Sequence, residues 1–126
     1  MNKRLMVVED NPDLLDIYQV CLQKDGFDVV CARDGEEALK QFVDCKPQVV
    51  VCDIKMPKLT GFDVIETIAS HPKLNQDVAF IVMSAYGDKD MVDRAEKLGI
   101  GRDRYLVKSQ ATLKDVLRTV RSAFAA

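Results

Sequence analysis

The sequence predicts an α/β protein in which five parallel strands are covered by helices on both faces. Five short apolar runs recur along the chain, and each is followed by a segment whose apolar residues repeat at helical spacing. The run Val-Val-Val-Cys at 49–52 is apolar without alternation, as expected for a central strand buried on both faces. Right-handed crossovers then favour the strand order 2-1-3-4-5, which is a flavodoxin-like (βα)5 doubly wound parallel sheet.

The elements of the first half are bounded by residues that start and stop helices. After a strand over 4–8, Asn11 is a preferred N-cap residue, Pro12 suits the first helical position, and Gly26 stops this helix. The elements that follow are a strand over 27–32, a helix over 35–44, a strand over 48–52 and a helix over 61–70. The helical residues expected to face the core recur three and four apart and are Leu14, Leu15, Tyr18, Cys21, Leu22, Ala38, Leu39, Phe42, Val43, Val64, Ile65, Ile68 and Ala69.

The second half continues the alternation of strand and helix. We expect a strand over 78–83, a helix that Asp88 caps and Gly99 ends, a strand over 104–107 and a last helix that Ser109 caps. The inward residues expected in these two helices are Met91, Val92, Ala95, Leu98, Leu113, Val116, Leu117, Val120 and Phe124. Five strand-helix units in a row imply a parallel sheet with helices on both sides.

Composition is that of a single ordinary globular domain. The 126 residues are 48% hydrophobic and 30% charged, and the net charge of −2 gives no reason to expect direct binding to nucleic acid or to a membrane. The start of the chain leads into only four apolar residues, too few for a signal peptide, so a cytoplasmic protein is expected. The four cysteines form no Cys-x-x-Cys pair and are expected to be reduced thiols.

Side chains that can bind a metal ion or a phosphoryl group follow four of the expected strands. Glu9 and Asp10 follow the first strand, Asp53 the third, Ser84 the fourth and Lys108 the fifth. The carboxyl ends of parallel strands share one edge of a sheet, and the switch point between the first and third strands is where such sheets bind ligands. We therefore expect these five side chains to meet in one pocket.

Three carboxylates in one pocket repel one another, and a bound cation would relieve that repulsion. Magnesium prefers oxygen ligands, so Asp10 and Asp53 are expected as direct ligands, Glu9 as a ligand through water, and a backbone carbonyl of the next loop as a further one. Asp53, on the central strand, is the expected nucleophile for a phosphoryl group. Lys108 would pair with one phosphoryl oxygen, and Ser84 would donate a hydrogen bond to another.

Over essentially its full length, residues 1–126, the chain resembles a response-regulator receiver domain of two-component signalling. The matching segments are Val7-Val8-Glu9-Asp10-Asn11, Asp53-Ile54-Lys55-Met56-Pro57-Lys58-Leu59-Thr60-Gly61, Met83-Ser84-Ala85 and Tyr105-Leu106-Val107-Lys108. The stretch Asp-x-x-Met-Pro-x-x-x-Gly is quite specific, and the acidic pair, the serine and the lysine strengthen it. The resemblance therefore covers a single receiver domain.

By that resemblance, Asp53 accepts a phosphoryl group from a histidine kinase or a phosphotransfer protein, with Mg²⁺ as cofactor. The implied metal ligands are Glu9, Asp10, Asp53 and the carbonyl oxygen of Lys55. Ser84 would swing toward the phosphoryl group and Tyr105 would rotate inward behind it, which switches the surface of the fourth helix, fifth strand and fifth helix. That surface would signal to a protein partner. The chain would be a signalling phosphoacceptor that catalyses its own phosphorylation and autodephosphorylation, and not an enzyme acting on other molecules.

The chain departs from the family's commonest pattern around Lys108. Ser109 follows this lysine where the family usually has proline, and the segment 100–104 before Tyr105 is slightly longer than usual. Tyr86 and Lys55 occupy the two variable positions that tune dephosphorylation in this family, and the bulk of Tyr86 predicts slow loss of the phosphoryl group.

Other function classes have less support in the sequence. An aspartyl-phosphate phosphohydrolase needs a second aspartate two positions after the nucleophile, and Lys55 stands there. A receiver-like scaffold that never carries phosphate usually lacks the nucleophile or an acidic partner, and this chain keeps both. A flavodoxin-like electron carrier needs a Ser/Thr-Gly-rich loop after the first strand, and the chain has Asn11-Pro12-Asp13 there.

Overall fold

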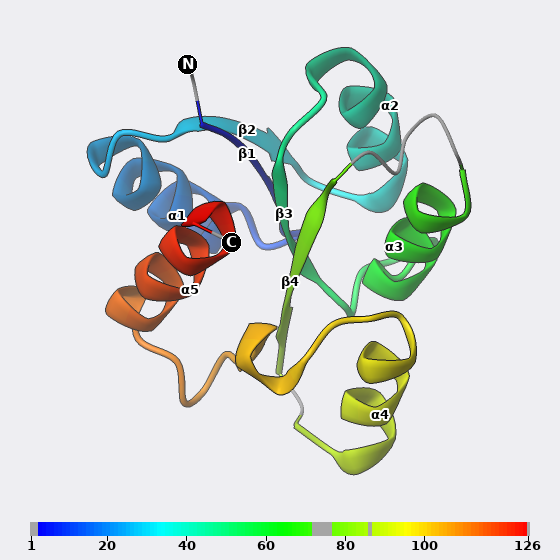
Figure 1. The fold of residues 1–126 in the computed structure, drawn as a ribbon. Helices are drawn as coiled ribbons and strands as arrows, with labels where there is room; N and C mark the ends of the chain where they lie inside the picture. The colour runs from blue at the N-terminus through cyan, green and yellow to red at the C-terminus, as the bar shows by residue number, and fades with distance from the viewer. Residues whose placement is uncertain (1–2, 72–76, 86, 126) are drawn as a thin grey trace.

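The fold is a single parallel sheet with helices on both faces. The computed structural model describes residues 3–71, 77–85 and 87–125, and within them the sheet has five strands in the order β2-β1-β3-β4-β5 (Figure 1). The strands are β1 (Arg4–Val8), β2 (Asp28–Ala32), β3 (Val49–Asp53), β4 (Ala79–Ser84) and β5 (Tyr105–Val107). The helices are α1 (Pro12–Lys24), α2 (Gly35–Cys45), α3 (Gly61–Ser70), α4 (Lys89–Lys97), the 3-10 helix η1 (Arg102–Arg104) and α5 (Leu113–Ala125). The predicted fold class and strand order are confirmed.

The register of the sheet places the strand ends side by side. Val8, the last residue of β1, pairs with Cys52 of β3, and Asp53 pairs with Met83 of β4. All neighbouring strands are parallel, so the residues that follow each strand lie at one edge of the sheet. The reversal of strand order between β1 and β3 forms the switch point at that edge.

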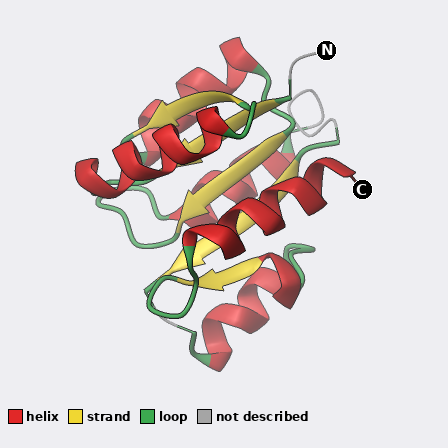
Figure 2. Cartoon of the chain, turned by 90° about the vertical axis from the view of Figure 1, so that its left-hand side faces the viewer, coloured by secondary structure: helices red, strands yellow, loops and turns green. Residues whose placement is uncertain are grey.

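The helices divide into two layers around the sheet. Helices α1 and α5 cover one face, and α2, α3 and α4 cover the other, with the strands between the two layers (Figures 1 and 2). Successive residues of β3 point into opposite cores: Val49 and Val51 pack toward α1 and α5, whereas Val50 and Cys52 pack toward α2, α3 and α4. Every residue of β3 is buried, which explains its continuous apolar run.

Local signals in the sequence explain the helix ends nearest the site. The Asn11 side chain accepts hydrogen bonds from the backbone N–H groups of Asp13 and Leu14, and so caps α1. Gly26 follows the end of α1 with a φ of +95°, a conformation that favours glycine. At the start of α3, Thr60 and the residue three positions later form a reciprocal capping box.

Three predictions about the helices are wrong. Ser109 does not cap α5: Thr112 accepts a hydrogen bond from the Asp115 N–H, while the Asp115 side chain accepts one from the Thr112 N–H. The chain first turns at residues 108–111, where two N–H groups bond to the carbonyl of the last β5 residue, and this delays the helix. Val43 is 53% exposed and Leu113 is 42% exposed, because these helices bury narrower stripes than the spacing suggested.

Asp88 stands at the N-cap position of α4, as predicted, but its side chain makes no capping hydrogen bond. The remaining differences are small. The segment before β5 that is longer than usual contains η1, and strand bounds differ from the predicted ones by one residue at most. Tyr86, on which the prediction of slow dephosphorylation rests, lies outside the described residues. None of the helices in the described parts of the chain is both long and apolar enough to cross a bilayer.

Candidate functional site

Three carboxylates meet at the carboxyl edge of the sheet. Glu9 and Asp10 follow β1, Asp53 ends β3, and one carboxylate oxygen from each lies within 4.8 Å of the other two. Glu9 and Asp53 are 2% and 4% exposed, whereas Asp10 is exposed. The cluster therefore has a buried floor and one side that is open to solvent.

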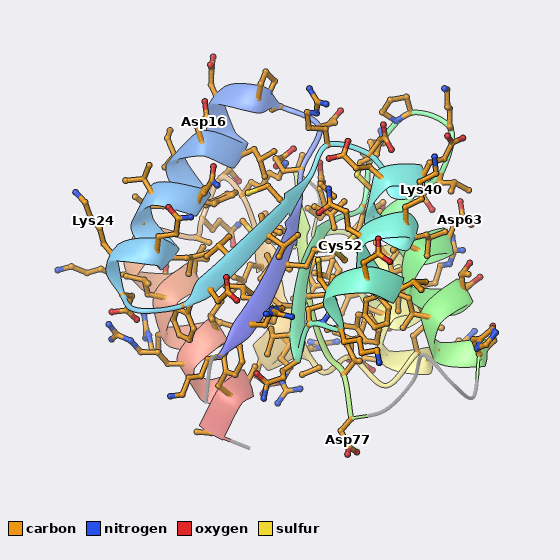
Figure 3. All side chains as sticks on the ribbon, turned by 90° about the horizontal axis from the view of Figure 1, so that it is seen from above. Asp16, Lys24, Lys40, Cys52, Asp63 and Asp77 are labelled. Carbon is orange, nitrogen blue, oxygen red and sulfur yellow. The ribbon has the colours of Figure 1, made fainter. Side chains whose placement is uncertain are left out.

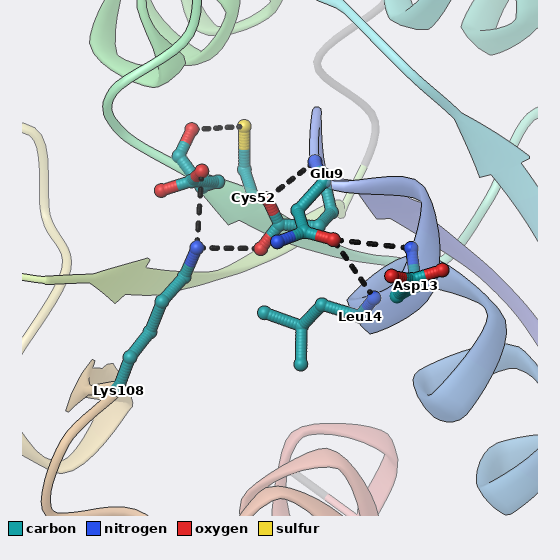
Figure 4. Close-up of polar contacts among 7 residues, drawn as sticks. Glu9, Asp13, Leu14, Cys52 and Lys108 are labelled. Atoms are coloured by element: carbon teal, nitrogen blue, oxygen red, sulfur yellow. Dashed lines mark hydrogen bonds and ion pairs between the residues drawn. The ribbon is translucent and has the colours of Figure 1, made fainter.

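Lys108 bridges the two buried carboxylates. Its Nζ lies 2.5 Å from Glu9 Oε1 and 3.1 Å from Asp53 Oδ2, and its side chain is 22% exposed (Figure 4). The Lys108 N–H donates to the carbonyl of Ser84 over 2.7 Å, which continues the pairing of β4 with β5 and aims the lysine into the cluster. The lysine thus reaches the site although Ser109 replaces the usual proline.

Burial makes ionisation of this cluster costly. Loss of solvent raises the pKa of Glu9 to about 7, although the Lys108 ammonium and the Asn11 N–H, which donates to Glu9 Oε2 over 3.2 Å, act to lower it. Burial also raises the pKa of Asp53, against the charge of Lys108. For Lys108, burial alone would lower the pKa, but the contacts with Glu9 and Asp53 outweigh it and raise the pKa. One ammonium cannot balance three carboxylates.

The donor set fits a divalent cation. Mg²⁺ takes oxygen ligands at about 2.1 Å in octahedral geometry, so two of its ligands are separated by up to about 4.2 Å. Carboxylate oxygens that lie within 4.8 Å of one another can converge on such an ion after small side-chain movements. Lys55 stands in the loop between Asp53 and α3, and its side chain is exposed; the use of its carbonyl oxygen as a ligand stays a prediction.

Ser84 and Tyr105 form a second, neighbouring group. Ser84 is 1% exposed and ends β4, one residue beyond Met83, which pairs with Asp53. Tyr105 starts β5 and is 8% exposed, so its ring is already buried in this structure. Burial raises the pKa of Tyr105, a hydrogen bond with the Ser84 side chain lowers it, and the charge of Asp88 raises it. Ser84 thus lies between Asp53 at the edge of the sheet and the buried ring of Tyr105 in β5.

One residue near the site was recognised in the sequence only as a packing residue. Tyr18 of α1 was predicted as a core residue and is 6% exposed, but its pKa, raised by burial, also responds to Lys108, Glu9 and Asp53. Its phenol therefore lies within electrostatic reach of the cluster. Nothing in its spacing separates it from a packing residue. Gly61, the glycine of the Asp-x-x-Met-Pro-x-x-x-Gly stretch, lies directly against the site: a Cβ there would lie 2.2 Å from the carbonyl oxygen of Asp53.

Cys52 adjoins the site without taking part in it. Its thiol donates to the carbonyl of Asp53 over 3.4 Å and points into the packed interior, in contrast to the outward-pointing Asp16, Lys24 and Lys40 (Figure 3). Full burial raises the pKa of this thiol, and the charges of Asp53 and Glu9 add to the effect. The thiol stays neutral, as expected for a cysteine that serves packing.

Comparisons with known proteins agree on one family. The family model described as the response regulator receiver domain matches residues 5–120. The alkaline phosphatase synthesis transcriptional regulatory protein PhoP of Bacillus subtilis is 33% identical over 124 residues, which are 94% of this chain and 50% of that protein. The probable transcriptional regulator ycf27 of Guillardia theta is 37% identical over 127 residues, 96% of this chain and 48% of that protein. This chain therefore spans about half the length of these relatives.

Solved structures show the same fold. A response regulator receiver domain protein from Clostridium thermocellum has a TM-score of 0.84 at 30% identity, covering 97% of this chain and 94% of that one. The chemotaxis protein CheY4 of Vibrio cholerae has a TM-score of 0.87 at 20% identity, covering 98% of this chain and 99% of that one. At that lower identity the likeness concerns the fold alone.

Proposed function

The chain belongs to the response regulator receiver domain family of two-component signalling, and from this premise we propose that Asp53 accepts a phosphoryl group from a histidine kinase or a phosphotransfer protein. The observation that carries the proposal is the convergence of Glu9, Asp10, Asp53 and Lys108 at one edge of the sheet. We propose that residues 1–126 act as one receiver domain.

The transfer is a displacement at phosphorus. A carboxylate oxygen of Asp53 attacks, an O–P bond forms, and the N–P bond of the phosphohistidine breaks. The bonding electrons remain on the imidazole nitrogen, which takes up a proton. When bound by Asp10 and Asp53, with Glu9 through water and the carbonyl of the loop residue Lys55, Mg²⁺ supplies neutralisation of the phosphoryl charge.

Lys108 and Ser84 hold the transferred group. The ammonium of Lys108, 3.1 Å from Asp53 Oδ2, is near enough to pair with an oxygen of a phosphoryl group on that carboxylate. The Ser84 hydroxyl donates a hydrogen bond to another phosphoryl oxygen. Its hydroxyl is hydrogen-bonded with Tyr105, so that bond has to be exchanged when the phosphoryl group arrives.

This exchange provides the switch. The charge of the phosphoryl group on Asp53 attracts the Ser84 hydroxyl. Tyr105 and the adjoining α4 then move to a second position. The surface of α4, β5 and α5 presents the result to a downstream protein. The net charge of −2 favours a protein partner over nucleic acid for this domain.

We propose no reaction on other molecules. The domain catalyses only its own phosphorylation and autodephosphorylation. A phosphohydrolase would need a carboxyl group two positions after Asp53 to protonate the leaving group, and Lys55 stands there. Sustained turnover of a generic phosphomonoester would contradict this assignment and favour a phosphohydrolase.

Intact-mass spectrometry tests the proposal. After incubation with acetyl phosphate and Mg²⁺, the wild-type chain should gain the mass of one phosphoryl group, and a chelator should prevent the gain. Asp53→Asn should gain nothing. Asp16→Asn, which changes an exposed aspartate of α1, is the matched control and should behave as the wild type. Phosphorylation of Asp53→Asn to the wild-type extent would refute the assignment, and a wild type that gains no mass would favour a scaffold.

A further inference from the structure

Helix α4 is attached to the rest of the domain by few buried contacts. Of its nine residues, all of which the structure describes, Ala95 alone is buried, whereas α3 buries five of its ten. An element with little buried apolar surface opens locally at low cost. Met91 and Val92 are only half-buried against the core, so specific contacts of the other α4 side chains can contribute appreciably to the position of the helix.

Arg94 makes two such contacts with α3. Its guanidinium carbon lies 4.6 Å from the centroid of the Phe62 ring, which is the geometry of a cation–π interaction. Its Nη2 donates to Glu66 Oε1 over 3.2 Å. A planar guanidinium can stack on a ring and donate a hydrogen bond at the same time, which an ammonium does less well. One side chain thus joins α4 to two turns of α3.

The Phe62 end of this contact is fixed to the backbone of Asp53. Phe62 is 2% exposed and follows Gly61, whose N–H donates to the carbonyl of Ile54 over 2.8 Å. A Cβ on Gly61 would lie 2.2 Å from the carbonyl oxygen of Asp53, so the first turn of α3 abuts the end of β3. Arg94 therefore contacts the Phe62 ring, and the position of that ring depends on the end of β3, which carries the proposed phosphoryl acceptor Asp53.

We propose that Arg94 is a positioning residue that holds α4 against α3 and so opposes the switch of the α4, β5 and α5 surface. The inference rests on the proposed function, because it takes α4 as part of the surface that moves. We infer that the two Arg94 contacts are made in the arrangement seen here and are lost when α4 moves, and a contact made in only one of two arrangements stabilises that one relative to the other. By thermodynamic linkage, its removal favours the switched arrangement and with it phosphorylation of Asp53.

The first test measures the attachment without any phosphoryl chemistry. Amide hydrogen exchange of α4 in Arg94→Ala should be faster than in the wild type by about 3- to 30-fold, the combined contribution of an exposed cation–π contact and a surface ion pair. Lys97→Ala, an exposed cation of the same helix, is the matched control and should show less change. Equal exchange in Arg94→Ala and Lys97→Ala would overturn the proposal.

The second test measures coupling to the acceptor. With limiting acetyl phosphate and Mg²⁺, Arg94→Ala should be phosphorylated a few-fold faster than the wild type, and Arg94→Lys should be intermediate. In a double-mutant cycle, Arg94→Ala should accelerate the reaction less in a Phe62→Leu background, since the ring contact is already absent. Faster exchange in α4 with an unchanged phosphorylation rate would refute the opposition to switching.

The two tests separate failure of this inference from failure of the proposed function. If the wild type accepts no phosphoryl group, the proposed function fails and the switching role of Arg94 fails with it. If the wild type is phosphorylated and Arg94→Ala matches it in both measurements, the proposed function stands and the role of Arg94 is refuted.

Discussion

Replacing Glu9 with glutamine should change how the stability of the metal-free domain depends on pH. Glu9 is 2% exposed, and burial raises its pKa from 4.5 to about 7. The folded chain therefore binds this proton more tightly than the unfolded chain. The stability that the protonated group contributes is present below pH 4.5 and is lost as the pH rises to about 7.

The size of the effect follows from the difference between the two pKa values. At about 1.4 kcal/mol per pKa unit, the change from 4.5 to about 7 corresponds to roughly 3 kcal/mol. Glutamine cannot ionise, so Glu9→Gln loses none of this stability on going from pH 5 to pH 8. Any constant effect of the weaker contact with Lys108 cancels when each protein is compared with itself at the two pH values.

Urea unfolding in the presence of EDTA at pH 5, 6, 7 and 8 measures this difference. Between pH 5 and pH 8, the free energy of unfolding of Glu9→Gln should increase by about 2–3 kcal/mol relative to that of the wild type. Glu36→Gln, at an exposed position in the first turn of α2, is the matched control and should run parallel to the wild type. Parallel curves for Glu9→Gln would refute the reasoning that burial of this carboxylate costs folding free energy.

Three further predictions concern the same edge of the sheet. Mg²⁺ at a hundredfold excess over its dissociation constant should stabilise the wild-type domain by about 2.7 kcal/mol, measured by thermal melts. Asp10→Asn should show little of this stabilisation, and equal stabilisation of the variant would contradict a metal site there. Lys108→Met removes the cation between two buried carboxylates, so metal-free urea unfolding at pH 8 should show a loss of about 1–3 kcal/mol, and unchanged stability would count against the ion pairs. Gly61→Ala places a Cβ 2.2 Å from the Asp53 carbonyl oxygen, so urea unfolding should show a loss of at least about 2 kcal/mol, and tolerance of alanine would contradict the close approach.

Sequence patterns predicted the scaffold well because they report local physics. The buried run of β3 reflects burial on two faces, and the pairing of Asn11 with Pro12 reflects the free N–H groups of a helix start. Ser109 shows the limit of such reasoning. It is a good N-cap residue by type, but the chain turns through residues 108–111 first, and Thr112 takes the cap.

The amino-acid order alone determined which residues follow the strands, and parallel strands with right-handed crossovers bring Glu9, Asp10, Asp53 and Lys108 to one edge. Packing decided the rest. That Lys108 lies between two buried carboxylates, that the charges of the cluster affect the pKa of Tyr18, and that an arginine of α4 stacks on a ring of α3 depend on how distant segments pack together. Hydrophobic periodicity indicates which side of a helix or strand is buried. It does not indicate which other element covers that side or how completely water is excluded there. The pKa values of the carboxylates follow from that exclusion, so they belong to the tertiary structure.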